Sequence, residues 1–205
     1  MEAVSPLESG VRNLHISGYR PPGDDVFRPS KTAAVLVPLL DQPDPEVVLT
    51  RRADHLPQHP GQVSFPGGAA EENDTSAVQT ALREAHEEIG LLPNTVRPIG
   101  FLDRMDTISD YRVLPVVALV TPPVIWLPDE REVAEVFTIP LSIILDIQRY
   151  EARIFKLHDR EYTIHSLQWE GYNVWGATAA MLMNLISRMQ VANEQQYSDI
   201  SNATE

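Results

Sequence analysis

Short apolar runs separated by turn-forming residues occupy most of the chain, and they predict a fold rich in β-strands. Residues 32–40 are almost all apolar, which predicts a buried strand, and residues 46–51 predict its hairpin partner after a turn at 41–45. The remaining strands are expected at 62–65, 95–105, 111–120 and 133–139, with a further hairpin at 153–157 and 162–165.

Helical periodicity is strongest between residues 75 and 89. Ser76 and Gln79 have the spacing of a capping box at its start, and Gly90 suits the left-handed residue that ends a helix. Apolar side chains recur within one stripe about 100° wide, formed by Val78, Ala81, Leu82, Ala85 and Ile89. This stripe is expected to face a sheet.

Two further helices are expected, a short one at 140–145 and an Ala- and Met-rich one at 176–189. Because strands outnumber helices, the pattern indicates an α+β fold with helices packed outside a mixed β-sheet. At 205 residues the chain fits one domain, expected at 31–190, between an irregular N-terminal arm at 1–30 and a polar C-terminal tail at 191–205.

The composition excludes several classes of protein. Apolar residues make up 43% of the chain and charged residues 22%, as in globular proteins, and no run approaches the ~20 apolar residues of a membrane span. The first residues lack the basic and apolar regions of a signal peptide, so we expect a cytoplasmic protein. The sequence holds no cysteine, which excludes disulfides, cysteine nucleophiles and cysteine-ligated zinc.

Negative charge limits the partners of the protein. The 29 Asp and Glu residues exceed the 16 Lys and Arg residues, which gives a net charge of −13. Such a chain lacks the basic surface that nucleic acids require, and an acidic membrane repels it. We therefore expect neither nucleic acid nor a membrane as a partner. A polyanionic substrate requires metal ions or a local basic cluster to offset the field.

Three carboxylates gather on one flank of the helix predicted at 75–89. Glu84 precedes Glu87 by three residues and Glu88 by four, so their side chains are neighbours. At about 4 Å and an effective dielectric constant of about 20, one such pair costs close to 4 kcal/mol. Arg83 can reach Glu87 one turn later, but a single guanidinium cannot neutralise three acids. A divalent cation could, and all-oxygen ligands favour Mg²⁺ or Mn²⁺.

The same segment resembles the Nudix box, the signature of the Nudix hydrolases. That signature is Gly, five residues, Glu, seven residues, and then Arg-Glu-apolar-x-Glu-Glu-x-Gly-apolar. The first half departs from it, because eight residues instead of seven separate Asp74 from Arg83, which leaves the early acid open among Glu71, Glu72 and Asp74. The second half is matched by Arg83, Glu84, Ala85, Glu87, Glu88, Gly90 and Leu91.

A second motif runs directly into the box, from residue 48 to residue 68. It includes Leu-Thr-Arg-Arg and Gly-Gln-Val-Ser-Phe-Pro-Gly-Gly, and it resembles the upstream motif of the coenzyme A pyrophosphatase branch of the family. Residues 172–178, which read Tyr-Asn-Val-Trp-Gly-Ala-Thr, resemble the opening of the family's last helix. The resemblance implies an α/β/α sandwich with a mixed β-sheet.

The resemblance also implies an activity. In the coenzyme A branch, the diphosphate bond of coenzyme A or its derivatives is hydrolysed to 3′,5′-ADP and 4′-phosphopantetheine. Other Nudix enzymes cut ADP-ribose, NADH, dinucleotide polyphosphates or capped RNA, and a non-catalytic binding module is a further alternative. The implied cofactor is Mg²⁺ or Mn²⁺ and the implied partner is a small-molecule nucleotide of the coenzyme A class, while a homodimer stays open.

Residue roles follow from the same resemblance. Glu84 and Glu88 rank first as metal ligands and Glu87 next, and Arg83 is expected to orient these acids. The general base is left open between these glutamates and a later carboxylate, for which the candidates are Glu130, Glu132 and Glu135. His86 occupies the variable position of the box and is expected on the surface, and we expect core positions for Trp175, Met181 and Met183.

The upstream motif supplies the candidate substrate-binding residues. Side chains alternate along a strand, so one of Arg51 and Arg52 is expected to point into the cleft and bind a phosphate. Gly67 and Gly68 let the backbone approach the phosphates. The other side chains expected to bind phosphate or line the site are His55, His59, Gln62 and Ser64.

Overall fold

The computed structural model describes residues 31–107, 110–157 and 160–202, which form a mixed β-sheet, a smaller antiparallel sheet and the helices around them. The predicted N-terminal arm, residues 1–30, lies outside the described residues. None of the helices in the described ranges is long and apolar enough to cross a membrane.

The centre of the main sheet is a parallel pair of strands. β1 (Lys31–Leu40) runs beside β7 (Tyr111–Val120) along its whole length. Both strands are apolar almost throughout, as expected for strands that are covered on two faces. β5 (Val96–Phe101) and β6 (Met105–Asp106) pair antiparallel with β7, whereas the sequence predicted one uninterrupted strand over this region.

β1 and its neighbour in the sheet are paired at one end only. β2 (Glu46–Arg52) pairs with β1 at one end and then diverges from it. In the gap, β3 (Val63–Ser64) pairs with β2, while β4 (Gly67–Ala69) pairs with β1. The predicted edge strand, β8 (Val133–Pro140), pairs with β2. Gly67 and Gly68, which follow the strand predicted at 62–65, therefore form a strand themselves beside residues 33–35 of β1.

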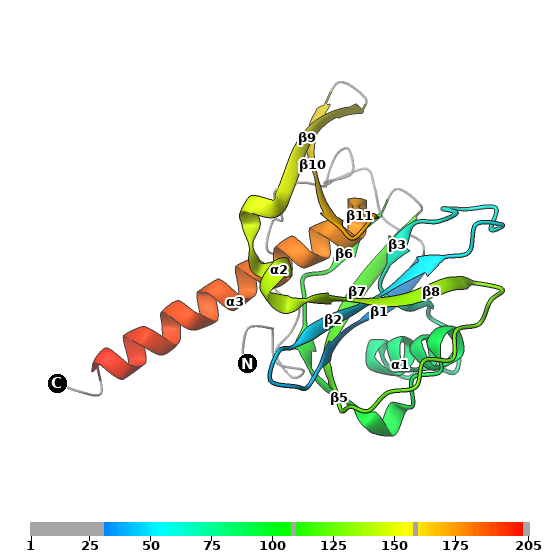
Figure 1. Ribbon diagram of the computed structural model, residues 1–205, viewed down its shortest axis with the longest axis horizontal. Helices are drawn as coiled ribbons and strands as arrows, with labels where there is room; N and C mark the ends of the chain where they lie inside the picture. Colours follow the sequence, from blue (N-terminus) through cyan, green and yellow to red (C-terminus); the bar gives the residue numbers. More distant parts are fainter. Residues whose placement is uncertain (1–30, 108–109, 158–159, 203–205) are drawn as a thin grey trace.

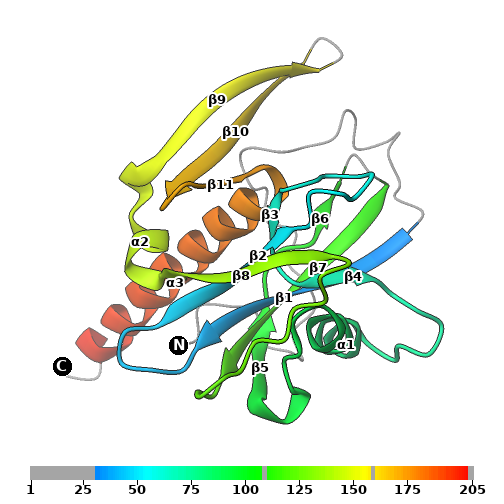
Figure 2. The same ribbon diagram turned by 45° about the vertical axis from the view of Figure 1, so that its right-hand side comes forward.

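Helices cover both faces of this sheet, which makes an α/β/α sandwich (Figures 1 and 2). α1 (Ala77–Ile89) packs on one face, where Ala81 and Ile89 are fully buried in a cluster with Leu36 of β1. α3 (Gly176–Asn202) begins on the other face, where Leu182 packs in a cluster with Val37. The architecture confirms the predicted α+β class with a mixed sheet.

α3 is longer than the sequence predicted. It continues to Asn202, past the expected end at residue 189, and Figure 1 shows it extending well beyond the sheet. After Gly176 the helical segment contains neither glycine nor proline, and it holds four Ala and three Gln, which favour a helix. A polar segment with these residues can continue a helix without burying an apolar face.

A second, three-stranded sheet stands beside the main one. β9 (Tyr150–Leu157) and β10 (Arg160–Trp169) form the predicted hairpin, which projects from the body in Figure 1. β11 (Tyr172–Trp175) pairs with β10 and leads directly into α3, and this strand was not predicted. The remaining elements are α2 (Leu141–Leu145), at the predicted place, and two 3₁₀ helices, Pro93–Thr95 and Ile147–Arg149.

Candidate active site

The position of α1 is fixed at both ends by local hydrogen bonds. Ser76 is its N-cap, and its hydroxyl oxygen accepts a hydrogen bond from the backbone N–H of Gln79, with 3.2 Å between the two atoms. Gly90 ends the helix in the left-handed conformation with φ 70°, and its N–H donates to the carbonyl of His86. These caps, with the buried stripe, hold the acids of α1 against β4.

Glu88 is a carboxylate buried under the main sheet. Glu88 is 6% exposed. Its Oε2 accepts a hydrogen bond from the backbone N–H of Gly67, with 3.1 Å between N and Oε2. Burial raises the pKa of Glu88 to about 8, and the nearby charges of Glu84 and Glu132 act in the same direction. The charged form therefore lacks the compensation that a counter-charge would provide.

Glu84 lies one turn before Glu88 and packs directly on Gly68. Its side chain is 16% exposed, and burial is the main cause that raises its pKa. A methyl group added at Gly68 would lie 2.5 Å from Oε1 of Glu84, so only glycine leaves room for this carboxylate. At Gly67 the added group would lie 2.5 Å from the carbonyl oxygen of Ala34. Backbone atoms therefore require glycine at position 67, whereas a side chain at position 68 would displace the flexible end of Glu84.

Arg83 connects the acids of the site. Its guanidinium donates to Glu84 at 3.0 Å and to Glu87 at 2.9 Å, measured from nitrogen to carboxylate oxygen. It also donates to Asp74 at 2.9 and 3.3 Å and to the carbonyl of Ala69 at 3.0 Å. Arg83 therefore ties α1 to the loop between β4 and α1.

The contacts of Arg83 distinguish the three early acids that the sequence left open. Asp74 has a side chain only 3% exposed, and its hydrogen bonds with Arg83 hold the pKa of its carboxyl well below the usual range. Glu71 is exposed and lies 3.8 Å from Arg83, and Glu72 is exposed. Asp74 is the early acid that the structure joins to the box.

The loop before β8 is fastened to the C-terminal end of α1. The backbone N–H of Leu127 donates to the carbonyl of Ile89 at 3.0 Å, and that of Asp129 donates to the carbonyl of Glu88 at 2.9 Å. These bonds bring Glu132 close enough for its charge to raise the pKa of both Glu84 and Glu88. Of the other later acids, Glu130 is exposed and Glu135 lies 3.7 Å from Arg51.

Arg51 and Arg52 have different neighbours, as alternation along β2 predicts. Arg51 forms a salt bridge with Asp54 at 2.8 Å. The charge of Arg52 acts instead on Glu88, whose pKa it lowers. Among the described residues Arg52 has no salt-bridge partner, and its Nε is buried without a hydrogen bond. Arg52 is therefore the arginine available to an anion near the carboxylates.

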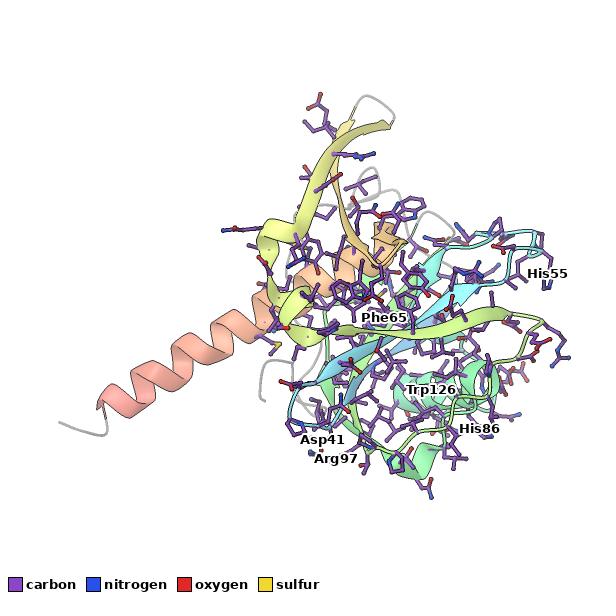
Figure 3. The ribbon with its side chains drawn as sticks, viewed as in Figure 1. Asp41, His55, Phe65, His86, Arg97 and Trp126 are labelled. Carbon is purple, nitrogen blue, oxygen red and sulfur yellow. The ribbon has the colours of Figure 1, made fainter. Side chains whose placement is uncertain are left out.

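The other predicted substrate residues divide between a cavity and the surrounding structure. His59 and Gln62 line a cavity of about 370 Å³, together with Arg51. Ser64 shares a hydrogen bond with the hydroxyl of Thr50 at 3.1 Å, so it holds β3 on β2. His55 is exposed on the loop that follows β2 and is not one of the residues that line the cavity (Figure 3).

Predictions for four residues without an assigned role in the site had mixed outcomes. Met181 is buried in the core, and His86 is exposed on α1 (Figure 3), as expected. Met183 is half-buried. The expected core position of Trp175 is wrong, because this residue is 43% exposed and lines the cavity. Its place on β11, a strand that was not recognised, directs it away from the core.

The carboxylates fit a hard divalent cation in chemistry, although their side chains do not form a complete metal site. Glu84 and Glu88 offer oxygen ligands whose charged forms are unfavourable without a counter-charge, which suits Mg²⁺ or Mn²⁺. In the part of the chain that the structure describes, no three acidic or histidine side chains converge closely enough to enclose an ion. Arg83 contacts both Glu84 and Glu87, but Glu87 is exposed, so the more buried Glu84 and Glu88 are the better ligands.

Several known proteins are similar to this chain. A model of the NUDIX domain matches residues 30–159. A protein of Enterobacter sp. named uncharacterized Nudix hydrolase NudL is 40% identical over 155 residues, which cover 76% of this chain and 81% of the relative. The NudL protein of Pectobacterium atrosepticum is 39% identical over 165 residues, covering 80% and 86%.

The fold has a counterpart among solved structures. The crystal structure of a MutT/nudix family protein from Enterococcus faecalis covers 86% of this chain and 66% of its own, with a TM-score of 0.50 at 14% identity. The names of the NudL relatives do not mention a substrate, so the action on coenzyme A stays a prediction. Nudix hydrolases generally use divalent cations and bind small nucleotide-derived substrates. By its domain match and its relatives, the chain belongs to the Nudix hydrolase family.

Proposed function

We propose that this protein is a Mg²⁺- or Mn²⁺-dependent hydrolase that cleaves the diphosphate bond of coenzyme A or its derivatives, giving 3′,5′-ADP and 4′-phosphopantetheine. The observation that carries the proposal is the hydrogen bond between Gly67 and Glu88, because it joins the upstream motif to the buried acid of the box. That motif is the part of the chain that resembles the coenzyme A branch. Arg52, Gly67 and Gly68 all come from it and lie at the carboxylates.

Glu84 and Glu88 are the proposed ligands of the cation, with Glu87 as the next candidate. Bound there, a divalent cation would neutralise phosphoryl oxygens and lower the pKa of a bound water. Burial supports the order of the three acids. It raises the pKa values of Glu84 and Glu88, so their charged forms would gain from a bound cation, whereas Glu87 is exposed to solvent.

The residues of the chain have distinct roles in the proposed reaction. A water oxygen attacks one phosphorus, the bond from that phosphorus to the bridging oxygen breaks, and the bridging oxygen leaves with the other phosphate. Glu132 is the proposed acceptor of the water proton, because it lies near both Glu84 and Glu88 on a loop fastened to α1. Arg52 binds a phosphate oxygen, and Arg83 keeps the acids in place.

A second candidate substrate class has one observation in its favour. Arg51 is held by Asp54 at 2.8 Å and lies 3.7 Å from Glu135, so its charge is already offset. The 3′-phosphate that distinguishes coenzyme A from other ADP derivatives needs a cationic partner, and Arg51 is a poor one. Hydrolysis of ADP-ribose, NADH or a dinucleotide polyphosphate would require no such partner.

Product analysis on a panel of substrates tests the proposal. The purified protein is incubated with Mg²⁺ or Mn²⁺ and coenzyme A, ADP-ribose, NADH or diadenosine polyphosphate, with the Glu84→Gln variant as the control. Formation of 3′,5′-ADP and 4′-phosphopantetheine by the wild type, and its loss in the variant, is the expected result. Cleavage of another nucleotide but not of coenzyme A would overturn the proposed substrate. Cleavage of none of them would overturn the proposal that the protein is a hydrolase.

A further inference from the structure

The cavity beside the upstream motif has a lining that the proposed carboxylate chemistry does not use. It lies between the loop before β3 and the strand β11, and it encloses about 370 Å³. That volume falls within the range of small-molecule sites, about 300–1,000 Å³. The lining residues that matter here are Arg51, His59, Gln62, Tyr172, Asn173 and Trp175.

Two aromatic residues of β11 form one wall of the cavity. Tyr172 is fixed, because its ring stacks on Phe137 with 3.7 Å between centroids and 5° between planes. The nearby carboxylate of Glu135 raises the pKa of its hydroxyl. Trp175 is 43% exposed, whereas Val174 before it is fully buried, so alternation along β11 directs the indole outward. Trp175 thus presents aromatic surface to the cavity on a strand held by β10.

Two amide side chains face the same cavity. The backbone of Gln62 is held by the N–H of Arg52 at 2.9 Å and by the carbonyl of His59 at 3.2 Å. Its side chain makes no hydrogen bond with the described residues, so both a donor and an acceptor are free. The Oδ1 of Asn173 accepts from Gln168 at 2.8 Å, which leaves its amide nitrogen as a donor. Donors and acceptors beside an aromatic face suit the edge and the plane of a heterocycle.

The charge of the cavity disfavours a phosphate in the same place. Arg51 points to it but is paired with Asp54 and lies close to Glu135. The two carboxylates therefore offset the charge of the arginine in the cavity lining. An uncharged, planar ligand avoids the cost of competing with these carboxylates.

We infer that this cavity is the subsite for the nucleobase of the substrate, with Trp175 as the stacking surface and Gln62 as the group that reads the edge of the base. The inference rests on the proposed action on a nucleotide diphosphate. Gly67 follows Gln62 by five positions, so their Cα atoms lie within about 18 Å of each other. The cavity is therefore joined by a short segment of chain to Gly67, whose N–H donates to Glu88.

Direct binding of 3′,5′-ADP tests the subsite without turnover. Its dissociation constant is measured by calorimetry in EDTA for the wild type and for Trp175→Ala, Trp175→Phe and Gln62→Ala. Ile154→Ala, an exposed apolar residue on β9, is the control. Trp175→Ala should weaken binding about tenfold or more, as expected for loss of base stacking. Trp175→Phe should restore most of the affinity, Gln62→Ala should weaken it, and Ile154→Ala should change nothing.

Two further readouts separate this inference from the proposed hydrolysis. In coenzyme A cleavage, Trp175→Ala should raise KM by a similar factor and leave kcat nearly unchanged, and it should not alter the binding of 4′-phosphopantetheine. Wild-type affinity for 3′,5′-ADP in both Trp175→Ala and Gln62→Ala, or no binding by the wild type, would overturn the subsite while leaving hydrolysis intact. If Trp175→Ala instead weakens the binding of 4′-phosphopantetheine, the cavity belongs to the other half of the substrate.

If Trp175 is required for nucleobase binding but the protein cleaves no nucleotide, the proposed function is overturned and the subsite still stands.

Discussion

The backbone N–H of Gly67 donates a hydrogen bond to Oε2 of Glu88 across a separation of 21 residues. The bond connects a short strand of the upstream motif to the most deeply buried acid of α1. The two glycines of β4 are both closely packed, since β1 lies against Gly67 and the carboxylate of Glu84 lies against Gly68. β4 and the acids of α1 are therefore in direct contact.

The two adjacent glutamates of α1 should differ in their contribution to catalysis. Glu88→Gln removes the charge of a buried proposed metal ligand, and we expect kcat to fall on the order of 100-fold or more. Glu87→Gln alters an exposed carboxylate that contacts Arg83, so its effect should be about tenfold or less. Steady-state kinetics with the preferred substrate measure both. Equal losses in the two variants would contradict the assignment.

The two adjacent glycines of β4 should separate stability from activity. Gly67→Ala places a methyl group 2.5 Å from backbone atoms of β1, and we expect a loss of about 1–3 kcal/mol in the free energy of unfolding. Gly68→Ala meets the mobile end of Glu84 instead. It should leave stability nearly unchanged but lower kcat on the order of 100-fold, because the carboxylate is displaced.

Urea unfolding and steady-state kinetics of both glycine variants test this contrast. An active Gly68→Ala variant would show that Glu84 need not lie where the structure has it. A Gly67→Ala variant as stable as the wild type would show that β4 can move away from β1.

Much of α1 is predictable because its signals are local. The Ser76 cap, the Gly90 stop and the apolar stripe lie within one short segment, and the structure has the helix where they indicate. Asp74 could not be chosen over Glu71 by spacing, because an inserted residue shifts the pattern. The choice depends on the approach of Arg83 from α1, which is a three-dimensional relationship.

Long-range pairing explains the errors. Gly67 and Gly68 indicate a break in a strand when read locally, but β1 supplies a partner more than thirty residues earlier in the chain, so they form β4. Trp175 is apolar and next to a helix start, which suggests a core position. Its direction is decided by pairing of β11 with β10, and that pairing turns Val174 inward and Trp175 outward.

Acid should weaken the link between Asp74 and Arg83. The pKa of Asp74 lies below its usual value of 3.8 in the folded protein, so the charged carboxylate stabilises the fold above that pH. This contribution is lost as the pH falls through the lower, folded-state pKa. We expect the difference in unfolding free energy between the wild type and Asp74→Asn to be constant from about pH 5 to 7 and to shrink below about pH 4. A difference that grows in acid would contradict this.

A buried polar network should anchor α3 to the main sheet. Asp103, whose side chain is 1% exposed, accepts hydrogen bonds from Arg188 and from the amide of Asn184, the latter at 2.7 Å. Asp103→Ala leaves Arg188 without its buried partner, and we expect a loss of about 3–5 kcal/mol in the free energy of unfolding. The exposed pair Arg153–Glu151 is the matched control, and Arg153→Ala should cost at most about 1 kcal/mol. Chemical denaturation that finds equal losses would refute the anchoring role.

Binding of Mn²⁺ in the absence of substrate tests the central claim most directly. Free Mn²⁺ is measured by electron paramagnetic resonance during titration of the wild type and of the Glu84→Gln, Glu87→Gln and Glu88→Gln variants. We predict that the wild type binds the ion, that Glu84→Gln and Glu88→Gln weaken binding by about tenfold or more, and that Glu87→Gln has a smaller effect. Wild-type affinity in both Glu84→Gln and Glu88→Gln would contradict the assignment of the metal to these buried carboxylates.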